Sequence, residues 1–240
     1  MLARHNLIWP TPSGWDSVQQ ASLSRPVTVR DAVARWRAAD WPLVVRRSEP
    51  DQLPGQVPVG LPLPPDEHGE KIRIGAVIGC DAVRRHALAP TCAEVMPTLA
   101  PQWRAAFLAL QMDWPDDLPP LRCHGSLAWQ MITGMSYLHA ASDIDLLFYP
   151  ANLQQLEQGI HLLDKHGVAL PLDGEIIFPG EVAVAWREWR AAMLTGGAGT
   201  VLAKRSDRVQ LVSCKALVLL LSLPAHLRGA ASGPTGSLSP

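Results

Sequence analysis

The sequence contains little cysteine, no long apolar run and almost no net charge. Its four cysteines, at positions 80, 92, 123 and 214, are widely spaced and form no CxxC pair. This spacing argues against a zinc cluster or a disulfide framework and predicts reduced structural thiols in a cytosolic protein. The apolar run at residues 216–223 is far too short to span a membrane, and the N-terminus lacks the apolar stretch of a signal peptide. We therefore expect a cytoplasmic protein with no membrane partner.

Charged residues of the two signs nearly cancel, with 21 Lys and Arg against 22 Asp and Glu and a formal net charge of −1. This balance argues against a protein that binds nucleic acid mainly through its phosphates, so no nucleic-acid partner is expected. Hydrophobic residues make up 48% of the 240 residues, which is ample for a core and excludes wholesale disorder. The length allows one large domain or two small ones.

Proline punctuates the first half of the chain. Residues 1–75 are irregular and rich in β-forming residues, with a predicted strand at 43–46 and helical spacing at 29–39. Residues 79–112 have a mainly helical pattern, which is clearest at 102–111. The first half is therefore expected to be a β-rich region followed by a helical one.

Residues 113–120 are rich in proline and aspartate and are typical of a linker. We place a domain boundary there, although the same stretch could be a long surface loop within one domain. The predicted division is an N-terminal region for substrate or partner binding at 1–117, a catalytic domain at 118–228 and a disordered tail at 229–240.

The second half alternates predicted strands and helices, which favours a mixed α+β fold. Apolar residues at 153, 156, 160 and 163, for example, recur at helical spacing. The predicted strands are residues 122–123, 143–149 and 175–178 with a hairpin at 201–204 and 209–212, and the predicted helices are 127–132, 153–163, 182–194 and 215–223.

Two aspartates alternate with aliphatic residues in one of these strands. Successive strand side chains point to opposite faces, so Asp143 and Asp145 project from one face while Ile144 points into the core. Two like charges side by side repel each other, and a bound cation normally stabilises such a pair. The pair predicts a magnesium site for a phosphate-bearing substrate, although Asp-x-Asp is short and also occurs in solvated turns.

A third carboxylate should come from a neighbouring strand. Phosphoryl and nucleotidyl transfer can use two divalent ions about 3.5–4 Å apart, which carboxylates on adjacent strands hold. We favour Glu175, because it directly precedes the apolar run at 176–178, and Asp173 is the alternative. Both residues could instead lie in a surface turn.

Gly125 and Ser126 stand at a predicted turn from a strand into a helix. Glycine lets the backbone approach a phosphate, and the free N–H groups at a helix start bind an anion, to which Ser126 can add a hydrogen bond. The same residues also suit a plain turn with Ser126 as the N-cap. Lys204 could neutralise a leaving diphosphate or lie in a solvated hairpin, and Trp129 is the tryptophan that we expect to line the pocket.

Lys71 and Arg73 are further candidates for contact with the substrate. A nucleophile pair of Cys123 and His124 is not expected, because adjacent strand residues point to opposite faces. The glycine-rich stretch at 196–199 has no GxGxxG spacing, so it predicts a flexible loop and no dinucleotide site.

The order of these motifs resembles that of the nucleotidyltransferase superfamily, which has the DNA polymerase β-like fold. Gly125-Ser126 matches its Gly-Ser motif, and Asp143 and Asp145 match its paired aspartates, although the sixteen residues 127–142 between them exceed the usual interval. The segment CHGSLAWQMITGMSYLHAASDIDLL at 123–147 closely resembles the MdcG family, malonate decarboxylase holo-[acyl-carrier-protein] synthases. The resemblance extends over nearly the whole chain.

This resemblance implies a C-terminal nucleotidyltransferase domain and a smaller N-terminal β-rich domain. It implies transfer of phosphoribosyl-dephospho-CoA from 2'-(5''-triphosphoribosyl)-3'-dephospho-CoA to a serine of the apo acyl-carrier subunit of malonate decarboxylase, with release of diphosphate. Asp143 and Asp145 would hold Mg²⁺ (or Mn²⁺), with Glu175 as a third carboxylate. Gly125 and Ser126 would grip the triphosphate, and Lys204 would contact phosphate.

Other functions remain open at this point. A different enzyme on the same fold could use an ordinary nucleoside triphosphate, and a citrate lyase-type holo-carrier synthase could use the same donor with another carrier. A non-catalytic, partner-binding domain is a third possibility, but such a domain could lose an aspartate, and both Asp143 and Asp145 are present.

Overall fold

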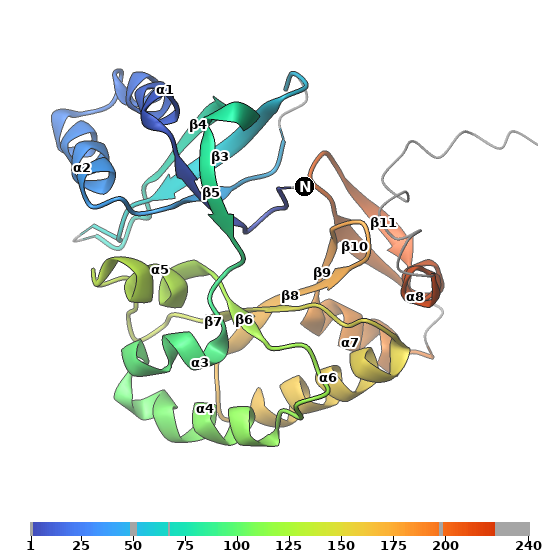
Figure 1. Cartoon of the computed structure of the whole chain (residues 1–240). Coiled ribbons are helices and arrows are strands. Elements are labelled where there is room, and N and C mark those ends of the chain that lie inside the picture. Colours follow the sequence, from blue (N-terminus) through green and yellow to red (C-terminus); the bar gives the residue numbers. More distant parts are fainter. Residues whose placement is uncertain (1, 49–51, 67, 197–198, 224–240) are drawn as a thin grey trace, which may run out of the picture. The chain divides into compact units, whose positions relative to one another are not determined.

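The structure, a computed structural model, describes residues 2–48, 52–66, 68–196 and 199–223. The predicted tail at 229–240 lies outside these ranges. Within them the chain forms eight α-helices and two β-sheets, so the expected mixed α+β class is confirmed (Figure 1). No helix in the described ranges combines the length and the apolar character needed to cross a membrane.

The chain divides into two compact units, which are described separately. The first unit comprises Met1–Ala105 and Arg122–Asp145, and the second comprises Ala106–Leu121 and Leu146–Pro240. The predicted domain boundary after residue 117 falls inside the Ala106–Leu121 segment, and it stays a prediction.

A five-stranded antiparallel sheet forms the centre of the first unit. On strand β4 (Arg73–Gly79), buried Ile74, Ala76 and Ile78 alternate with exposed Arg73, Gly75 and Val77, as expected where only one face is packed. The strands lie in the order β4-β3-β2-β1-β5, with the others being β1 (Leu7–Pro10), β2 (Leu43–Val45), β3 (Gln56–Pro62) and β5 (Val83–Ala87).

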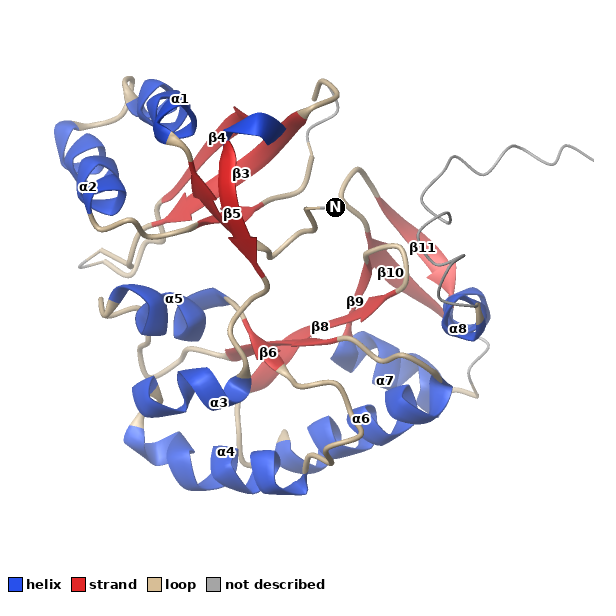
Figure 2. Ribbon diagram, in the orientation of Figure 1, coloured by secondary structure: helices blue, strands red, loops and turns tan. Residues whose placement is uncertain are grey.

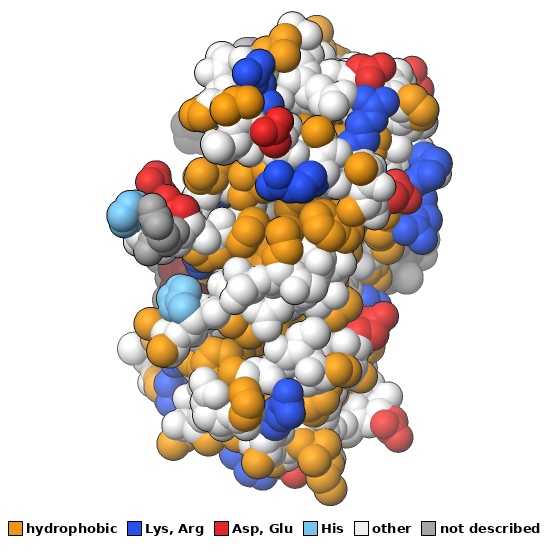
Figure 3. Space-filling model, turned by 90° about the vertical axis from the view of Figure 1, so that its left-hand side faces the viewer, with side chains coloured by type: hydrophobic (Ala, Val, Ile, Leu, Met, Phe, Trp, Pro, Cys, Tyr) orange, Lys and Arg blue, Asp and Glu red, His pale blue; other side chains and the backbone are white. Residues whose placement is uncertain are grey.

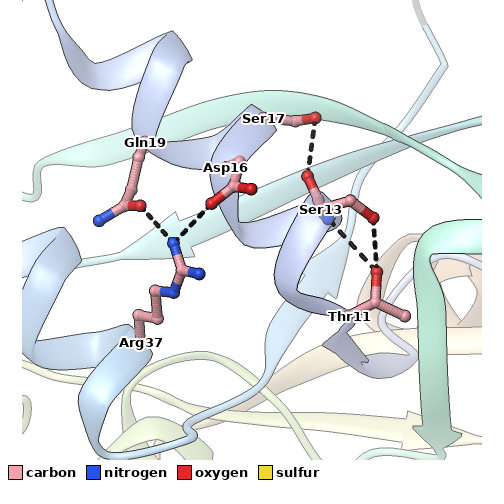
Figure 4. Close-up of polar contacts among 7 residues, drawn as sticks. Thr11, Ser13, Asp16, Ser17, Gln19 and Arg37 are labelled. Carbon is pink, nitrogen blue, oxygen red and sulfur yellow. Dashed lines mark hydrogen bonds and ion pairs between the residues drawn. The ribbon is translucent and has the colours of Figure 1, made fainter.

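Two helices, α1 (Pro12–Ser22) and α2 (Val27–Ala38), cover the packed face of this sheet (Figure 2). Trp15 of α1 and Trp36 of α2 join the buried residues of β4 in one hydrophobic core. Arg37 of α2 contacts Asp16 and Gln19 of α1, which ties the two helices together (Figure 4).

The sequence predicted α2 and strand β2 but missed α1. The helix begins where Thr11 acts as the N-cap and accepts a hydrogen bond from the Gly14 N–H at 3.4 Å (Figure 4). Proline follows at the first helical position. It is tolerated there because a backbone N–H at this position would have no partner within the helix. These start signals lay within a stretch whose prolines suggested irregular structure.

The predicted helical pattern at 79–112 is wrong over strand β5 (Val83–Ala87). This strand pairs with β1, with Leu7 opposite Ala87, so pairing within the sheet overrides the local pattern. The clearest predicted helix, 102–111, is confirmed as α4 (Pro101–Asp113). The remaining elements before residue 134 are the 3₁₀ turns Cys80–Ala82 and Met96–Thr98, α3 (Cys92–Val95), β6 (Arg122–Cys123) and α5 (Gly125–Thr133).

A six-stranded sheet has the order β11-β10-β9-β8-β7-β6, and the chain passes from the first unit to the second within β7 (Ile144–Phe148). Ile144, Leu146, Leu147 and Phe148 of β7 are all buried, as the apolar run predicted. The other strands are β8 (Leu172–Phe178), β9 (Val182–Ala185), β10 (Thr200–Lys204) and β11 (Val209–Ser213).

Three helices lie wholly in the second unit, and α4 enters it at Ala106; the three are α6 (Leu153–His166), α7 (Trp186–Leu194) and α8 (Cys214–Ser222). The predicted helix at 182–194 is wrong over its first four residues. These form strand β9, which pairs with β8 through Ile176–Val184 and Phe178–Val182, because buried Val-Ala-Val suits a strand that is covered on both faces.

Glycine allows close packing of α6 on β7. A β-carbon at Gly159 would overlap the ring of Phe148, so the missing side chain lets the helix backbone lie directly on that ring. Trp114 packs edge-on against the same ring, with the centroids 5.3 Å apart. Lys165 and His166, in the last turn of α6, donate hydrogen bonds to Asp113 at the end of α4. These bonds hold the pKa of the Asp113 carboxyl below its usual value.

Candidate active site

One face of the five-stranded sheet carries a row of side chains that become smaller toward β4. Leu7 pairs with Val44, Val44 with Gly60, and Gly60 with Gly75, so these four residues share a face. It is the face opposite to Ile74, Ala76 and Ile78, and we call it the outer face; at its β1 end Leu7 is itself buried in the hydrophobic core. The two glycines leave a shallow trough over β3 and β4.

Arg46 follows strand β2 and lies in this trough. A β-carbon at Gly60 would be 3.0 Å from Cδ of Arg46, and one at Gly75 would lie well under 3.0 Å from Nη1. The backbone N–H of Arg46 donates a hydrogen bond of 2.9 Å to the carbonyl of Pro58, which anchors the residue beside β3. The Arg46 side chain therefore extends across two strands that carry no side chain at this point, with its stem over Gly60 and its guanidinium over Gly75.

The predicted turn from a strand into a helix is confirmed, and helix α5 begins at Gly125, two residues before its predicted start, with His124 between it and strand β6. Gly125 has a φ of +64°, a left-handed conformation that L residues rarely adopt. The carboxylate of Asp145 lies against its α-carbon, and a β-carbon there would be only 2.9 Å from Cγ of Asp145. The backbone N–H of His124 donates to the Asp145 carbonyl at 2.9 Å, which fixes the aspartate beside the helix start.

Ser126 is nearly buried, and its hydroxyl accepts a hydrogen bond from Nζ of Lys71 at 3.5 Å. Tyr137 donates from its hydroxyl to the carbonyl of Pro62 at 2.8 Å, which joins the segment after α5 to the end of β3. These two contacts connect the Gly-Ser turn to the sheet of the first unit.

The outer face and the start of α5 line one cavity of about 1150 Å³, larger than most small-molecule sites. Among the described residues that line it, six are Lys or Arg and one, Asp145, is a carboxylate. The polar and aromatic lining residues are Arg4, His5, Arg25, Arg46, Arg47, Ser48, Lys71, Arg73, His124, Ser126, Trp129, Tyr137 and Asp145.

Positive charge is thus concentrated in a chain whose formal net charge is −1. On the face shown in Figure 3, by contrast, Lys and Arg side chains are interspersed with Asp, Glu and hydrophobic side chains. A concave site lined by one sign of charge raises the local concentration of an oppositely charged ligand. Guanidinium groups and helix N–H groups both bind phosphate oxygens, so the cavity suits a polyphosphate.

The two aspartates among the predicted metal ligands have different surroundings. Asp145, at the second position of β7, is half-buried and lines the cavity, whereas Asp143 precedes the strand and is exposed. Carboxylate oxygens are ligands that Mg²⁺ prefers, and the space left by the missing side chain of Gly125 lets Asp145 face the cavity, so the residues present fit the ion. Within the described residues, no group of three or more His, Cys, Asp or Glu side chains is arranged to hold a metal, so the site stays a prediction.

The predicted third carboxylate and the predicted phosphate-binding lysine contact each other in the second unit. Nζ of Lys204 on β10 lies 3.0 Å from Oε1 of Glu175 on β8, and the Glu175 side chain is only 10% exposed. Asp173, the alternative, is exposed. The structure therefore brings Gly125, Ser126 and Asp145 together in the first unit, and Glu175 and Lys204 together in the second.

Cys123 is a buried thiol, in agreement with the expectation that it forms no nucleophile pair with His124. Its Sγ lies 3.5 Å from Sγ of Cys92. The hydrogen bond with Cys92 and the burial raise the pKa of Cys123 well above its usual value. The thiolate needed for nucleophilic attack is therefore not populated at neutral pH.

Comparisons with known proteins now assign the family. Two family models match the chain in succession: the phosphoribosyl-dephospho-CoA transferase MdcG N-terminal domain at residues 3–89 and the corresponding C-terminal domain at 87–215. The chain belongs to the MdcG family. It is therefore a transferase, as the motif order predicted.

Curated MdcG-family relatives cover most of the chain. A phosphoribosyl-dephospho-CoA transferase of Xanthomonas campestris pv. campestris (strain 8004) is 36% identical over 219 residues, which are 90% of this chain and 97% of that protein. Proteins with the same description from Bradyrhizobium diazoefficiens and Pseudomonas putida are 31% and 30% identical, and cover 87% and 79% of this chain and 89% and 85% of their own. No solved structure matches the chain.

Several residues that line the cavity of this MdcG-family chain could not be predicted from the sequence. Arg46 stands in an ordinary β-rich run, and nothing local indicates that Gly60 and Gly75 pair across two strands. Lys71 and Arg73 were candidates for contact with the substrate, and both line the cavity. Trp129 lines the cavity, as predicted.

Gly125→Ala should lower the transfer rate about 100-fold, because catalytic groups displaced by about 1 Å can cost that much. The new β-carbon would push the Asp145 carboxylate away from the helix start. Gly134→Ala is the matched control, since Gly134 ends the same helix with a φ of +70° and open space around it. Both variants should lose about 1 kcal/mol of stability from the backbone strain, but only Gly125→Ala should lose activity. Equal rates in the two variants would contradict the role of this close contact.

Proposed function

We propose that this chain attaches the prosthetic group of malonate decarboxylase to its acyl-carrier subunit. The donor would be 2'-(5''-triphosphoribosyl)-3'-dephospho-CoA, and the acceptor would be a serine hydroxyl of the apo carrier. The names and family of the relatives support the donor class. The malonate decarboxylase carrier follows from the close resemblance of residues 123–147 to that family.

The observation that carries this proposal is the cationic cavity at the Gly-Ser turn. Among the described residues that line it, six are Lys or Arg and one is a carboxylate, and the first residues of α5 line the same cavity. A triphosphate is a multiply charged anion whose oxygens accept hydrogen bonds from guanidinium, ammonium and backbone N–H groups. Binding it here would set its reacting phosphate beside the turn and Asp145.

In the proposed reaction, the serine oxygen bonds to the phosphorus nearest the ribose, and the hydroxyl proton is released. The bond from that phosphorus to the oxygen bridging to the next phosphate breaks, and diphosphate leaves with the electron pair. Gly125 and Ser126 would hold phosphate oxygens through backbone N–H groups and a hydroxyl, and the basic side chains of the cavity would neutralise the charge that develops on diphosphate.

Asp143 and Asp145 would hold Mg²⁺ (or Mn²⁺), and Glu175 is proposed as a third carboxylate. When bound, the ion supplies electrostatic stabilisation of the phosphate charge and lowers the pKa of an attacking hydroxyl. Lys204, now seen beside Glu175, is proposed to contact phosphate. These roles assume the nucleotidyltransferase fold that the motif order predicts for the C-terminal part of the chain.

The decisive experiment weighs the carrier by mass spectrometry. The full chain is incubated with Mg²⁺, the triphosphoribosyl-dephospho-CoA donor and the apo acyl-carrier subunit of malonate decarboxylase. A mass gain equal to phosphoribosyl-dephospho-CoA, with release of diphosphate, is the expected result. A folded protein with verified donor and no mass gain contradicts the proposal.

Parallel reactions separate the alternatives. Turnover with ATP or CTP but not with the dephospho-CoA donor would indicate a different nucleotidyltransferase. Faster labelling of a citrate lyase carrier than of the malonate decarboxylase carrier would keep the donor and replace the acceptor. Binding of the carrier without any transfer would indicate a non-catalytic partner domain.

A further inference from the structure

The trough in the outer face places one guanidinium of the cavity in a defined position. Arg46 lies over Gly60 and Gly75, which face each other across β3 and β4. A side chain at position 60 would occupy the space of the aliphatic stem of Arg46, and one at position 75 would occupy the space of its guanidinium. A purely structural arginine on an open sheet face needs no such trough, because its long side chain can extend to solvent.

Charge within the cavity is distributed unevenly. The carboxylate of Asp145 lies at the α5 side, against Gly125, whereas Arg46 and Arg73 belong to the sheet side. Lys71 extends from the segment before β4 to the Ser126 hydroxyl, so its charge lies between the two sides. An extended polyanion meets, at the α5 side, a carboxylate that is assigned to a divalent ion, and it meets the fixed guanidinium groups of Arg46 and Arg73 at the sheet side. Its most highly charged end is therefore expected at the sheet side.

We propose that Arg46 binds the terminal diphosphate part of the donor's triphosphate and that the glycine trough exists to position it. This assignment rests on the proposed function and orients the substrate within the cavity. The reacting phosphate lies beside the Gly-Ser turn, and the two phosphates that leave as diphosphate lie over the outer face. A planar guanidinium can bridge two phosphate oxygens with parallel N–H bonds, which an ammonium cannot.

The same contact should favour the reaction as well as binding. When the bond to the leaving oxygen breaks, negative charge accumulates on the diphosphate, and a guanidinium held beside it stabilises that charge. Free inorganic diphosphate, the released product, should consequently bind the same residues. This gives a probe that requires neither the donor nor the carrier.

The test measures binding of inorganic diphosphate to the full-length chain by calorimetry. Arg46→Met keeps the aliphatic stem but removes the charge, and should weaken binding by at least about 10-fold, as expected for a hydrogen bond between charged groups. Arg46→Lys keeps the charge and should recover binding only in part. Arg30→Met, at an exposed position on α2, is the control for loss of one positive charge.

Gly75→Ala provides an independent measurement. Its β-carbon would displace the end of the flexible Arg46 side chain rather than backbone, and no unusual φ is involved. Alanine in a strand is less costly than glycine, so the variant should unfold at the wild-type temperature or above while diphosphate binding falls about 10-fold. Gly55→Ala is the control for binding alone: its β-carbon has nothing within 4 Å, but its φ of +81° makes alanine cost some stability.

The combined outcomes separate this inference from the proposed function. Unchanged diphosphate affinity in both Arg46→Met and Gly75→Ala overturns the role of Arg46, even if the carrier is labelled normally. Weakened affinity in both variants supports the anion site, even if no carrier is labelled. Where labelling occurs, a loss of at least about 10-fold in kcat/KM with Arg46→Met supports the orientation of the leaving group.

Discussion

Asparagine at position 145 should reduce the transfer rate at least about 1000-fold. Asn keeps the shape of the side chain but removes its charge, so it can no longer neutralise a divalent ion at the start of α5. Electrostatic stabilisation by a bound metal supplies several kcal/mol to a transition state, and each 1.4 kcal/mol corresponds to about tenfold in rate. Asp145 is half-buried on the cavity wall. No other carboxylate is among the described residues that line the cavity, so none is in place to replace it.

A second readout separates a metal ligand from a structural carboxylate. Mg²⁺ should raise the unfolding temperature of the wild-type chain but not that of Asp145→Asn, because a ligand that binds only the folded state stabilises it. Asp143→Asn should also lose activity, and Asp31→Asn, at an exposed position on α2, is the control. An Asp145→Asn variant that retains Mg²⁺-dependent transfer would refute the assignment.

Gly174→Ala should destabilise the chain more than any other substitution that adds a single methyl group. Gly174 lies in β8 with a φ of +130°, and its β-carbon would overlap the backbone carbonyl of Leu146 in β7 and lie 2.5 Å from the Leu146 nitrogen. Backbone atoms of a central strand cannot move aside. Overpacking and a disallowed φ together should cost roughly 3–5 kcal/mol, which corresponds to a fall of about 10 °C or more in Tm for a chain of this size.

Gly180→Ala is the matched control for this substitution. Gly180 has a φ of +76° in the turn after β8, but its β-carbon would meet only Nη1 of Arg205 at 3.7 Å. The control therefore carries the conformational strain without the overlap and should cost about 1–2 kcal/mol. Thermal unfolding followed by circular dichroism measures both. A Gly174→Ala variant that melts within a few degrees of the control would contradict the close approach of β7 and β8.

Local sequence patterns correctly predicted those helices and strands whose structure depends mainly on their own residues. The amphipathic spacing of α6, the apolar run of β7 and the Gly-Ser turn at α5 were all confirmed. Strands β5 and β9 were missed because their conformation depends on partners elsewhere in the chain. A run such as Val-Ala-Val-Ala suits a strand or a buried helix equally, and only pairing with β8 decides between them.

The same division applies to the candidate site. Gly125, Ser126 and Asp145 form a motif within one stretch of sequence. Phosphate-binding and metal-binding roles could therefore be predicted for them without knowledge of the structure. The cationic part of the cavity is assembled from residues between 4 and 73, whose meeting depends on strand register. Sequence spacing contains no information about which two glycines face each other across a sheet.

The composition of the cavity also constrains how this family can evolve. Its outer face and Arg46 fall within the N-terminal family match at 3–89, whereas Gly125, Ser126 and Asp145 fall within the C-terminal match at 87–215. Recombination that exchanged either half between distant relatives would join an anion-binding surface from one lineage to a Gly-Ser turn from another. The two halves should therefore be inherited together, and chimeras divided near residue 88 should be impaired unless their parents are similar.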